Sequence, residues 1–144
     1  MTRLLLLLMI TMSACSSMQN NQVLSPTLQL QTSYRVEWIG ERPLMDYSYL
    51  NIVLDQDNKA YGLAGCNYWS TNYQLQGNKL TFDNSISVTK KDCAPALMEQ
   101  EQRFLNALKT IKSWDFSDIQ QLQLWPENGQ PIKLWAEEKQ DKRS

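Results

Sequence analysis

The sequence predicts a mainly β protein, a small antiparallel β-barrel-like domain with one amphipathic α-helix around residues 95–112. Apolar and polar residues alternate over several short segments, and turn-forming residues separate these segments. Only one segment has apolar residues at helical spacing. Regularly spaced short strands with period-two alternation indicate an antiparallel sheet that curls into a barrel or a sandwich.

The N-terminus has the pattern of a secretory signal peptide over residues 1–14. Arg3 supplies a positive charge, residues 4–10 are an apolar run, and the small residues Ser13 and Ala14 follow. A membrane-spanning helix needs about 20 apolar residues, and this run is well short of that length. We therefore expect residues 1–14 to be removed during export.

The segment Met12-Ser13-Ala14-Cys15 resembles the bacterial lipobox. This resemblance implies that Cys15 receives lipid on its sulfur and becomes the new N-terminus. Two or more acyl chains at one terminus anchor a protein stably to a bilayer. Ser16 and Ser17 stand where an Asp would imply retention in the inner membrane, so the resemblance implies an outer-membrane lipoprotein that faces the periplasm. The alternative is an ordinary secretory signal followed by a chance cysteine.

The remaining chain divides into three parts. Residues 15–33 are polar and lack clear periodicity, which predicts a lipidated N-terminus and flexible tether, although a strand within residues 27–31 is an alternative. Residues 34–136 form the predicted domain. Residues 137–144 are almost all charged or polar, which predicts a disordered tail.

Period-two alternation predicts the strands of the domain. Turns are expected at residues 55–58, at Gly77-Asn78, and at Asn128-Gly129, where the dipeptide predicts a type I′ turn. The predicted strands lie around residues 34–38, 50–54, 59–64, 69–75, 80–82, 86–88, 122–124 and 132–134.

Residues 95–112 are predicted to be helical. The segment contains no glycine, and its apolar residues recur at helical spacing from Leu97 to Ile111. Pro95 suits the first turn of a helix. Acidic residues near the start and basic residues near the end match the charge preference of the helix dipole. These residues are Glu99, Glu101, Lys109 and Lys112.

The cysteine count favours one disulfide. Assigning Cys15 to lipid leaves Cys66 and Cys93. An even remainder in an exported protein predicts a bond between them, and the alternative is two buried free thiols.

The composition excludes several kinds of chemistry. The chain has no histidine, which excludes His-based acid–base catalysis and His-ligated metals. A net charge of −1 gives no basic field to attract nucleic acid. Asp55 and Asp57 fall in a predicted turn, where Asp is favoured for conformational reasons. We therefore expect no enzyme activity, no cofactor, no metal and a monomeric protein.

The segment Gly62-Leu63-Ala64-Gly65-Cys66-Asn67 resembles the META domain family, which includes the HslJ-like bacterial heat-shock lipoproteins. Other matching positions follow in the same order, namely Trp69, Tyr73, Thr89, Cys93, Phe104 and Leu108. The resemblance implies a small β-barrel-like fold of lipocalin-like topology with one helix. It also implies associations with heat stress and novobiocin resistance, without an agreed catalytic activity. Tyr68 and the segment 90–92 depart from the family pattern.

The motif also has a purely structural interpretation. Gly62 and Gly65 permit a bulge or a close approach of two backbones beside the disulfide. Asn67 tolerates left-handed backbone geometry and can bond its own backbone, and the alternative is a ligand-binding role.

Trp125 and Trp135 are candidates for a partner surface. Each is out of phase with the apolar residues of its strand, which predicts that both lie on the opposite face of their hairpin. An exposed pair there would suit another envelope protein, and the alternative is burial under the tether. The sequence thus leaves two functions: a non-catalytic interaction or stress-response module, or a lipocalin-like binder of a small apolar ligand inside the barrel.

Overall fold

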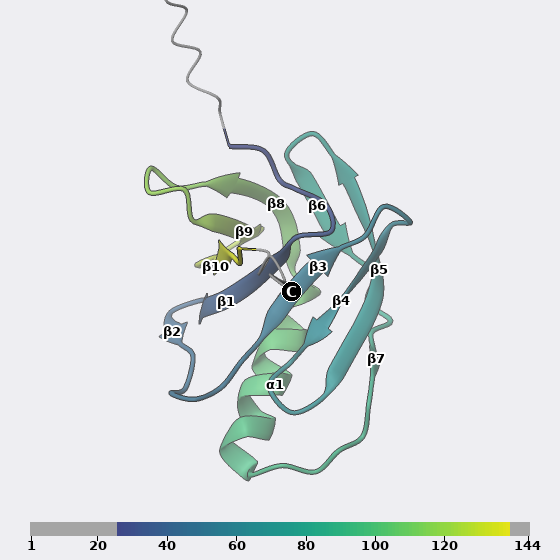
Figure 1. Cartoon of the computed structure of the whole chain (residues 1–144), viewed down its shortest axis with the longest axis vertical. Coiled ribbons are helices and arrows are strands. Elements are labelled where there is room, and N and C mark those ends of the chain that lie inside the picture. Colours follow the sequence, from purple (N-terminus) through teal and green to yellow (C-terminus); the bar gives the residue numbers. More distant parts are fainter. Residues whose placement is uncertain (1–25, 139–144) are drawn as a thin grey trace, which may run out of the picture.

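The strands pair in an order that closes on itself (Figure 1). In the computed structural model, which describes residues 26–138, each barrel strand pairs antiparallel with its neighbours in the order β1–β3–β4–β5–β6–β8–β9–β10. The pairing of β10 with β1 completes an eight-stranded barrel. The strands are β1 (Ser33–Ile39), β2 (Arg42–Pro43), β3 (Asn51–Leu54), β4 (Lys59–Leu63), β5 (Tyr68–Gln76), β6 (Lys79–Phe82), β7 (Ser87–Val88), β8 (Ile111–Phe116), β9 (Leu122–Pro126) and β10 (Ile132–Ala136).

Two short strands lie outside the closed circuit. β2 pairs with the end of β1, and β7 pairs with the start of β5. The second half of β5 pairs with β6 instead. The mainly β, barrel-like fold with one helix is therefore confirmed.

Apolar side chains fill the interior of the barrel. Because side chains alternate across a strand, each strand sends every second residue inward. The buried core comprises Tyr34, Val36, Ile39, Leu50, Ile52, Leu54, Ala60, Ala64, Trp69, Tyr73, Leu80, Phe82, Phe104, Leu105, Leu108, Ile111, Leu122, Leu124, Ile132 and Leu134. A carrier would need an open apolar cavity in this space.

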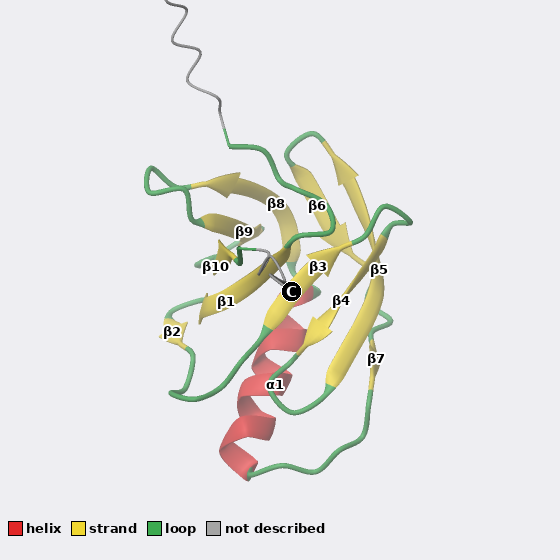
Figure 2. Ribbon diagram, viewed as in Figure 1, coloured by secondary structure: helices red, strands yellow, loops and turns green. Residues whose placement is uncertain are grey.

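The helix α1 (Pro95–Leu108) closes one end of the barrel; Figure 2 shows it in red in the lower part of the view. Phe104 and Leu108 are fully buried in the core. The Phe104 ring packs edge-on against Trp69, with 5.7 Å between the ring centroids. The helix thus contributes directly to the interior.

The prediction that the helix extends to residue 112 was wrong. The helix ends at Leu108, where the Thr110 hydroxyl and N–H both donate to the Ala107 carbonyl. Ile111 then begins β8, a strand that the sequence pattern did not reveal. The expected match to the helix dipole is also absent, because the first turn of α1 has no acidic residue and the last turn has no basic residue.

Two local details differ from the predicted alternation and turns. A register shift between Val36 and Trp38 turns Ile39 inward and leaves Trp38 half-buried, with the Lys133 ammonium 5.6 Å from its ring centroid. Of the Asn128-Gly129 pair, only Gly129 has a positive φ, whereas a type I′ turn needs two. The connection between β9 and β10 is therefore longer than a two-residue turn.

The packed part of the chain extends past both predicted boundaries, 34 and 136. Leu28 packs against the core, and the Gln31 N–H donates to the Leu54 carbonyl over 2.7 Å. At the other end, the Glu137 N–H donates to the Ser33 carbonyl. Residues 27–31 form no strand. The predicted signal peptide, Cys15 and most of the predicted tether and tail lie outside the described residues.

Candidate functional site

The motif residues occupy the connection between β4 and β5, where two glycines meet specific steric demands. A Cβ on Gly62 would lie 2.0 Å from the Asn51 carbonyl oxygen, which is far inside contact distance. Gly65 has φ +102°, a backbone conformation that residues with a Cβ rarely adopt. The predicted close backbone approach at this motif is present in the structure.

Asn67 is the centre of a buried hydrogen-bond network. The sequence predicted that its side chain bonds its own backbone. Instead, the side chain bonds residues that lie more than 20 positions later in the chain. Its Oδ1 accepts from the Thr89 hydroxyl at 2.9 Å and from the Lys91 N–H at 2.7 Å. Its Nδ2 donates to the Lys91 carbonyl at 3.1 Å. Every polar atom of the side chain is hydrogen-bonded, and the residue is only 2% exposed. Asn67 therefore has a structural role, because it connects the start of β5 to the segment from Thr89 to Lys91.

Glu101 completes this network from the helix. Its carboxylate accepts from the Asn67 N–H at 2.7 Å and from Asn67 Nδ2 at 2.9 Å, and the residue is 1% exposed. From the sequence pattern, the only role predicted for Glu101 was that of an acidic residue whose charge suits the start of the helix. One signal of burial was available, because Glu101 lies four residues after Leu97 and three before Phe104, on the apolar face of the helix.

The predicted disulfide joins Cys66 to Cys93, with 6.1 Å between the two Cα atoms. Cys66 lies next to Asn67 in the motif, and Cys93 lies two residues before Pro95, the first residue of α1. The bond therefore holds the entry of the helix beside the same connection that Asn67 and Glu101 link.

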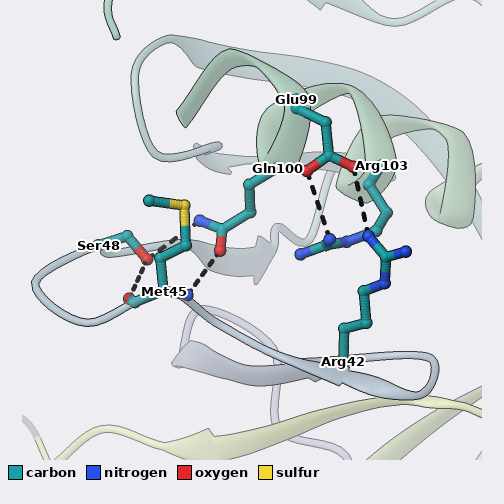
Figure 3. A network of polar contacts seen from close by, with 6 residues as sticks. All are labelled: Arg42, Met45, Ser48, Glu99, Gln100 and Arg103. Carbon is teal, nitrogen blue, oxygen red and sulfur yellow. Dashed lines mark hydrogen bonds and ion pairs between the residues drawn. The ribbon is translucent and has the colours of Figure 1, made fainter. Parts of the chain in front are cut away.

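A second polar network joins α1 to the segment between β2 and β3 (Figure 3). Gln100 is fully buried; its Oε1 accepts from the Met45 N–H at 2.7 Å, and its Nε2 donates to the Ser48 hydroxyl at 3.0 Å. Beside it, Glu99 contacts the guanidinium groups of Arg103 at 3.4 Å and Arg42 at 3.6 Å. Sequence reasoning missed Gln100, although it lies three residues after Leu97 and four before Phe104, on the same apolar face as Glu101.

Trp125 and Trp135, the predicted partner pair, lie apart from each other in the structure. β9 and β10 pair Ile132 with Leu124 and Leu134 with Leu122. Extending this register places Trp135 opposite residue 121, four positions from Trp125, or about 13 Å along the hairpin. Each indole N–H donates to a different carboxylate: Trp125 to Asp115 and Trp135 to Glu37. The two side chains do not form one apolar patch.

Trp135 instead lines a groove of about 480 Å³ against the segment between β2 and β3. We call this the Trp135 groove; it is lined by Arg35, Glu37, Trp38, Tyr47 and Trp135, with Pro43 to Ser48 along one side. Tyr47 is fully exposed at its rim. Because Gln100 holds Met45 and Ser48, the helix positions this side of the groove.

A second groove, of about 380 Å³, lies on the outer wall over β4, β5 and β7. We call this the Tyr61–Tyr68 groove; its lining includes Tyr61, Tyr68, Ser70, Ser87 and Thr89. None of the residues that line it is charged. Thr89 connects the groove to the motif, because its hydroxyl donates to Asn67 and accepts from the Tyr68 N–H.

The described residues contain no group of three or more His, Cys, Asp or Glu side chains that could hold a metal ion. Asp55 accepts a hydrogen bond from the neighbouring Gln56 N–H, as expected for a turn residue.

Burial raises the pKa values of Tyr34, Tyr49 and Tyr73 above the ordinary range, which keeps these phenols protonated. Within residues 26–138, no helix is long and apolar enough to cross a membrane.

The fold and the motif network define a class of protein: a small closed antiparallel barrel with one helix at an end. A buried asparagine and a disulfide connect the barrel to this helix. The chain belongs to the META domain family, whose model matches residues 26–139. A solution NMR structure of a protein from Burkholderia xenovorans has a similar fold, with a TM-score of 0.63 and 24% identity over 76% of this chain and 84% of the other. A second NMR structure has a TM-score of 0.56 and 24% identity over 73% of this chain and 89% of the other. A search of curated proteins found no match.

Proposed function

We propose that this protein is a membrane-anchored bacterial envelope lipoprotein whose META domain serves as a non-catalytic interaction or stress-response module. Membership of the META family and the lipobox-like segment ending at Cys15 support an envelope role. The anchor is the lipid on Cys15, and the location is the periplasmic side of the outer membrane. Tolerance of heat or of an antibiotic is the proposed role by resemblance to the family.

The observation that carries this proposal is the filled interior of the barrel. Phe104 and Leu108 of α1 are both fully buried and belong to the core that fills this interior. Binding surfaces are therefore expected on the outer wall rather than inside. This favours an interaction module over a lipocalin-like binder of an apolar molecule.

The Trp135 groove is the proposed contact site for another envelope protein. Its lining combines Trp, Tyr and Arg, the side chains that are enriched at protein interfaces. Two of its lining residues take part in cation–π contacts with residues beside the groove: Arg35 lies over the Tyr49 ring, and Lys133 lies over the Trp38 ring. The attraction between a cation and the face of a ring favours a defined arrangement of these side chains before a partner binds.

Two measurements test the proposal. The Cys15→Ser variant should move from the detergent phase to the aqueous phase, and its continued partitioning into detergent would refute the lipid anchor. In intact cells, chemical crosslinks to a partner should be lost in Tyr47→Ala plus Trp135→Ala and kept in Ile119→Ala, which removes an exposed apolar side chain outside the groove. Unchanged crosslinks in the double variant would refute the contact site.

Cell survival tests the stress role separately. A strain that lacks the protein should survive heat or novobiocin less well than its parent. The wild-type gene should restore survival, and the Cys15→Ser gene should not. Equal survival of the parent and the deletion strain would refute this role, whether or not the protein is lipidated.

A further inference from the structure

The Tyr61–Tyr68 groove has a lining that suits one class of ligand. Tyr61 is 43% exposed and Tyr68 is 68% exposed, so both rings offer surface to solvent. The barrel register places Tyr61 opposite Ser70 and Ser70 opposite Ser87, in one row across three strands. Tyr68 lies in the next row, two residues along β5, which is about 7 Å away. The groove therefore has two exposed aromatic side chains beside two serine hydroxyls, and Gly62, Trp69 and Val88 add apolar surface to its lining.

Four hydroxyl groups in the lining of this groove are free to bind, and only that of Thr89 is already engaged. Among the residues that the structure describes, the hydroxyls of Tyr61, Tyr68, Ser70 and Ser87 have no hydrogen-bond partner in the protein. Each hydroxyl can both donate and accept. The groove thus offers several two-way hydrogen-bonding groups with no net charge to favour an anion or a cation.

The motif holds this groove in shape. Asn67 orients the Thr89 hydroxyl, and Thr89 in turn exchanges two hydrogen bonds with the backbone of Tyr68, at 3.1 Å and 3.0 Å. Gly62 lies in the lining and allows β4 to approach Asn51 closely. The base of the Tyr68 side chain is therefore fixed by the same network that joins β5 to α1.

We propose that the Tyr61–Tyr68 groove binds a neutral pyranose ring of a glycan. A pyranose has an apolar face of C–H groups and a rim of hydroxyls. The negative face of an aromatic ring attracts polarised C–H groups, and the free serine and tyrosine hydroxyls match the rim. An apolar ligand would bury these hydroxyls without partners, which is unfavourable. This inference does not depend on the lipid anchor or on the Trp135 groove.

The test uses the full chain in detergent micelles, labelled with ¹⁵N, and two uncharged probes: the trisaccharide of N-acetylglucosamine and maltotriose. The proposal expects saturable chemical-shift changes at the backbone amides of Tyr61, Tyr68, Ser70 and Ser87 with at least one probe. A response to the first probe alone points to an N-acetylated glycan, and a response to both points to recognition of the ring itself.

Variants give the decisive comparison. Tyr61→Ala plus Tyr68→Ala should weaken binding at least tenfold, and the matched Tyr47→Ala variant should bind normally, since Tyr47 is exposed on the Trp135 groove instead. A Ser70→Glu variant, which places a charge in the groove without removing an aromatic ring, should also weaken binding. Each variant is first checked for an intact disulfide and an unchanged circular dichroism spectrum.

Three results would overturn the inference. The first is the absence of shifts at these amides with either trisaccharide at millimolar concentration. The second is unaltered binding by the double variant. The third is tighter binding of an end-capped, uncharged leucine tripeptide than of either sugar at the same amides, which would make the groove a peptide site.

Discussion

Asn67 and Glu101 are 34 positions apart in the chain, yet the Glu101 carboxylate accepts two hydrogen bonds from Asn67, one from its backbone N–H at 2.7 Å and one from its side chain at 2.9 Å. Both residues are almost completely buried. A carboxylate is stable in such a place only when donors surround it. The pair therefore links the position of the helix to that of the motif.

Removing the Asn67 side chain should destabilise the domain strongly. Asn67→Ala deletes one donor to Glu101 and leaves the Thr89 and Lys91 groups without their partner, so we expect a loss of about 3 kcal/mol. Chemical denaturation measures this loss. The matched variant is Asn72→Ala, an exposed asparagine on β5, for which we expect a loss below about 1 kcal/mol. Equal losses in the two variants would show that the buried network contributes nothing specific.

Gly62→Ala should be more damaging than its size suggests. The new Cβ would lie 2.0 Å from the Asn51 carbonyl oxygen, so β3 and β4 must separate. We expect a loss of more than about 2 kcal/mol in the free energy of unfolding, because overpacking in a closed structure forces backbone shifts.

Gly40→Ala is the comparison for that variant, because Gly40 has a positive φ but no atom within 4 Å of the place that a Cβ would occupy. Backbone strain alone should cost about 1 kcal/mol there. If Gly40→Ala proved the more destabilising of the two, steric contact with Asn51 would not be the reason for a glycine at position 62.

Reduction of the Cys66–Cys93 bond should weaken the fold. The bond closes a loop with a sequence separation of 27, which the chain-entropy relation equates with about 3.5 kcal/mol of stability. Thermal unfolding with and without a reductant measures the difference, and Cys66→Ser plus Cys93→Ser should melt with the reduced protein. A melting temperature that ignores the reductant would contradict the prediction.

Gln100→Ala should loosen the segment from Met45 to Ser48 without unfolding the barrel. Gln100 supplies the contacts from α1 to Met45 and Ser48, while the barrel strands pair independently of it. Amide hydrogen exchange should therefore accelerate at Met45 and remain slow in β5. The exposed neighbour variant Gln102→Ala should change neither region.

Alkaline pH should remove stability through Tyr34. Burial raises the pKa of Tyr34 in the folded state, so the unfolded chain releases this proton first. The contribution is complete below the unfolded value of about 10 and is lost as the pH rises through the folded-state pKa. In urea titrations, the stability advantage of wild type over Tyr34→Phe should therefore shrink once the pH exceeds the unfolded-state pKa of about 10. An advantage that stays constant would contradict the assignment.

The cysteines show how much a local pattern can reveal. The export signal and the cysteine count predicted the Cys66–Cys93 bond, because redox compartment and parity restrict the pairing without any knowledge of the fold. Glu101 shows the opposite case. Its position on the apolar face was visible, but its partner Asn67 was not, since the two come together only when the barrel closes over α1.

By itself, the sequence determined the strand alternation, the single helix, the disulfide and the META resemblance, since each depends on residues close together or on a simple count. Only the tertiary structure decided the end of α1 at Leu108, the presence of β8, and the separation of Trp125 from Trp135. It alone also brought Tyr61, Tyr68 and Ser70 into one groove. The physical reason is register: which residues lie opposite one another depends on strand pairing across the barrel, and local periodicity carries no information about it.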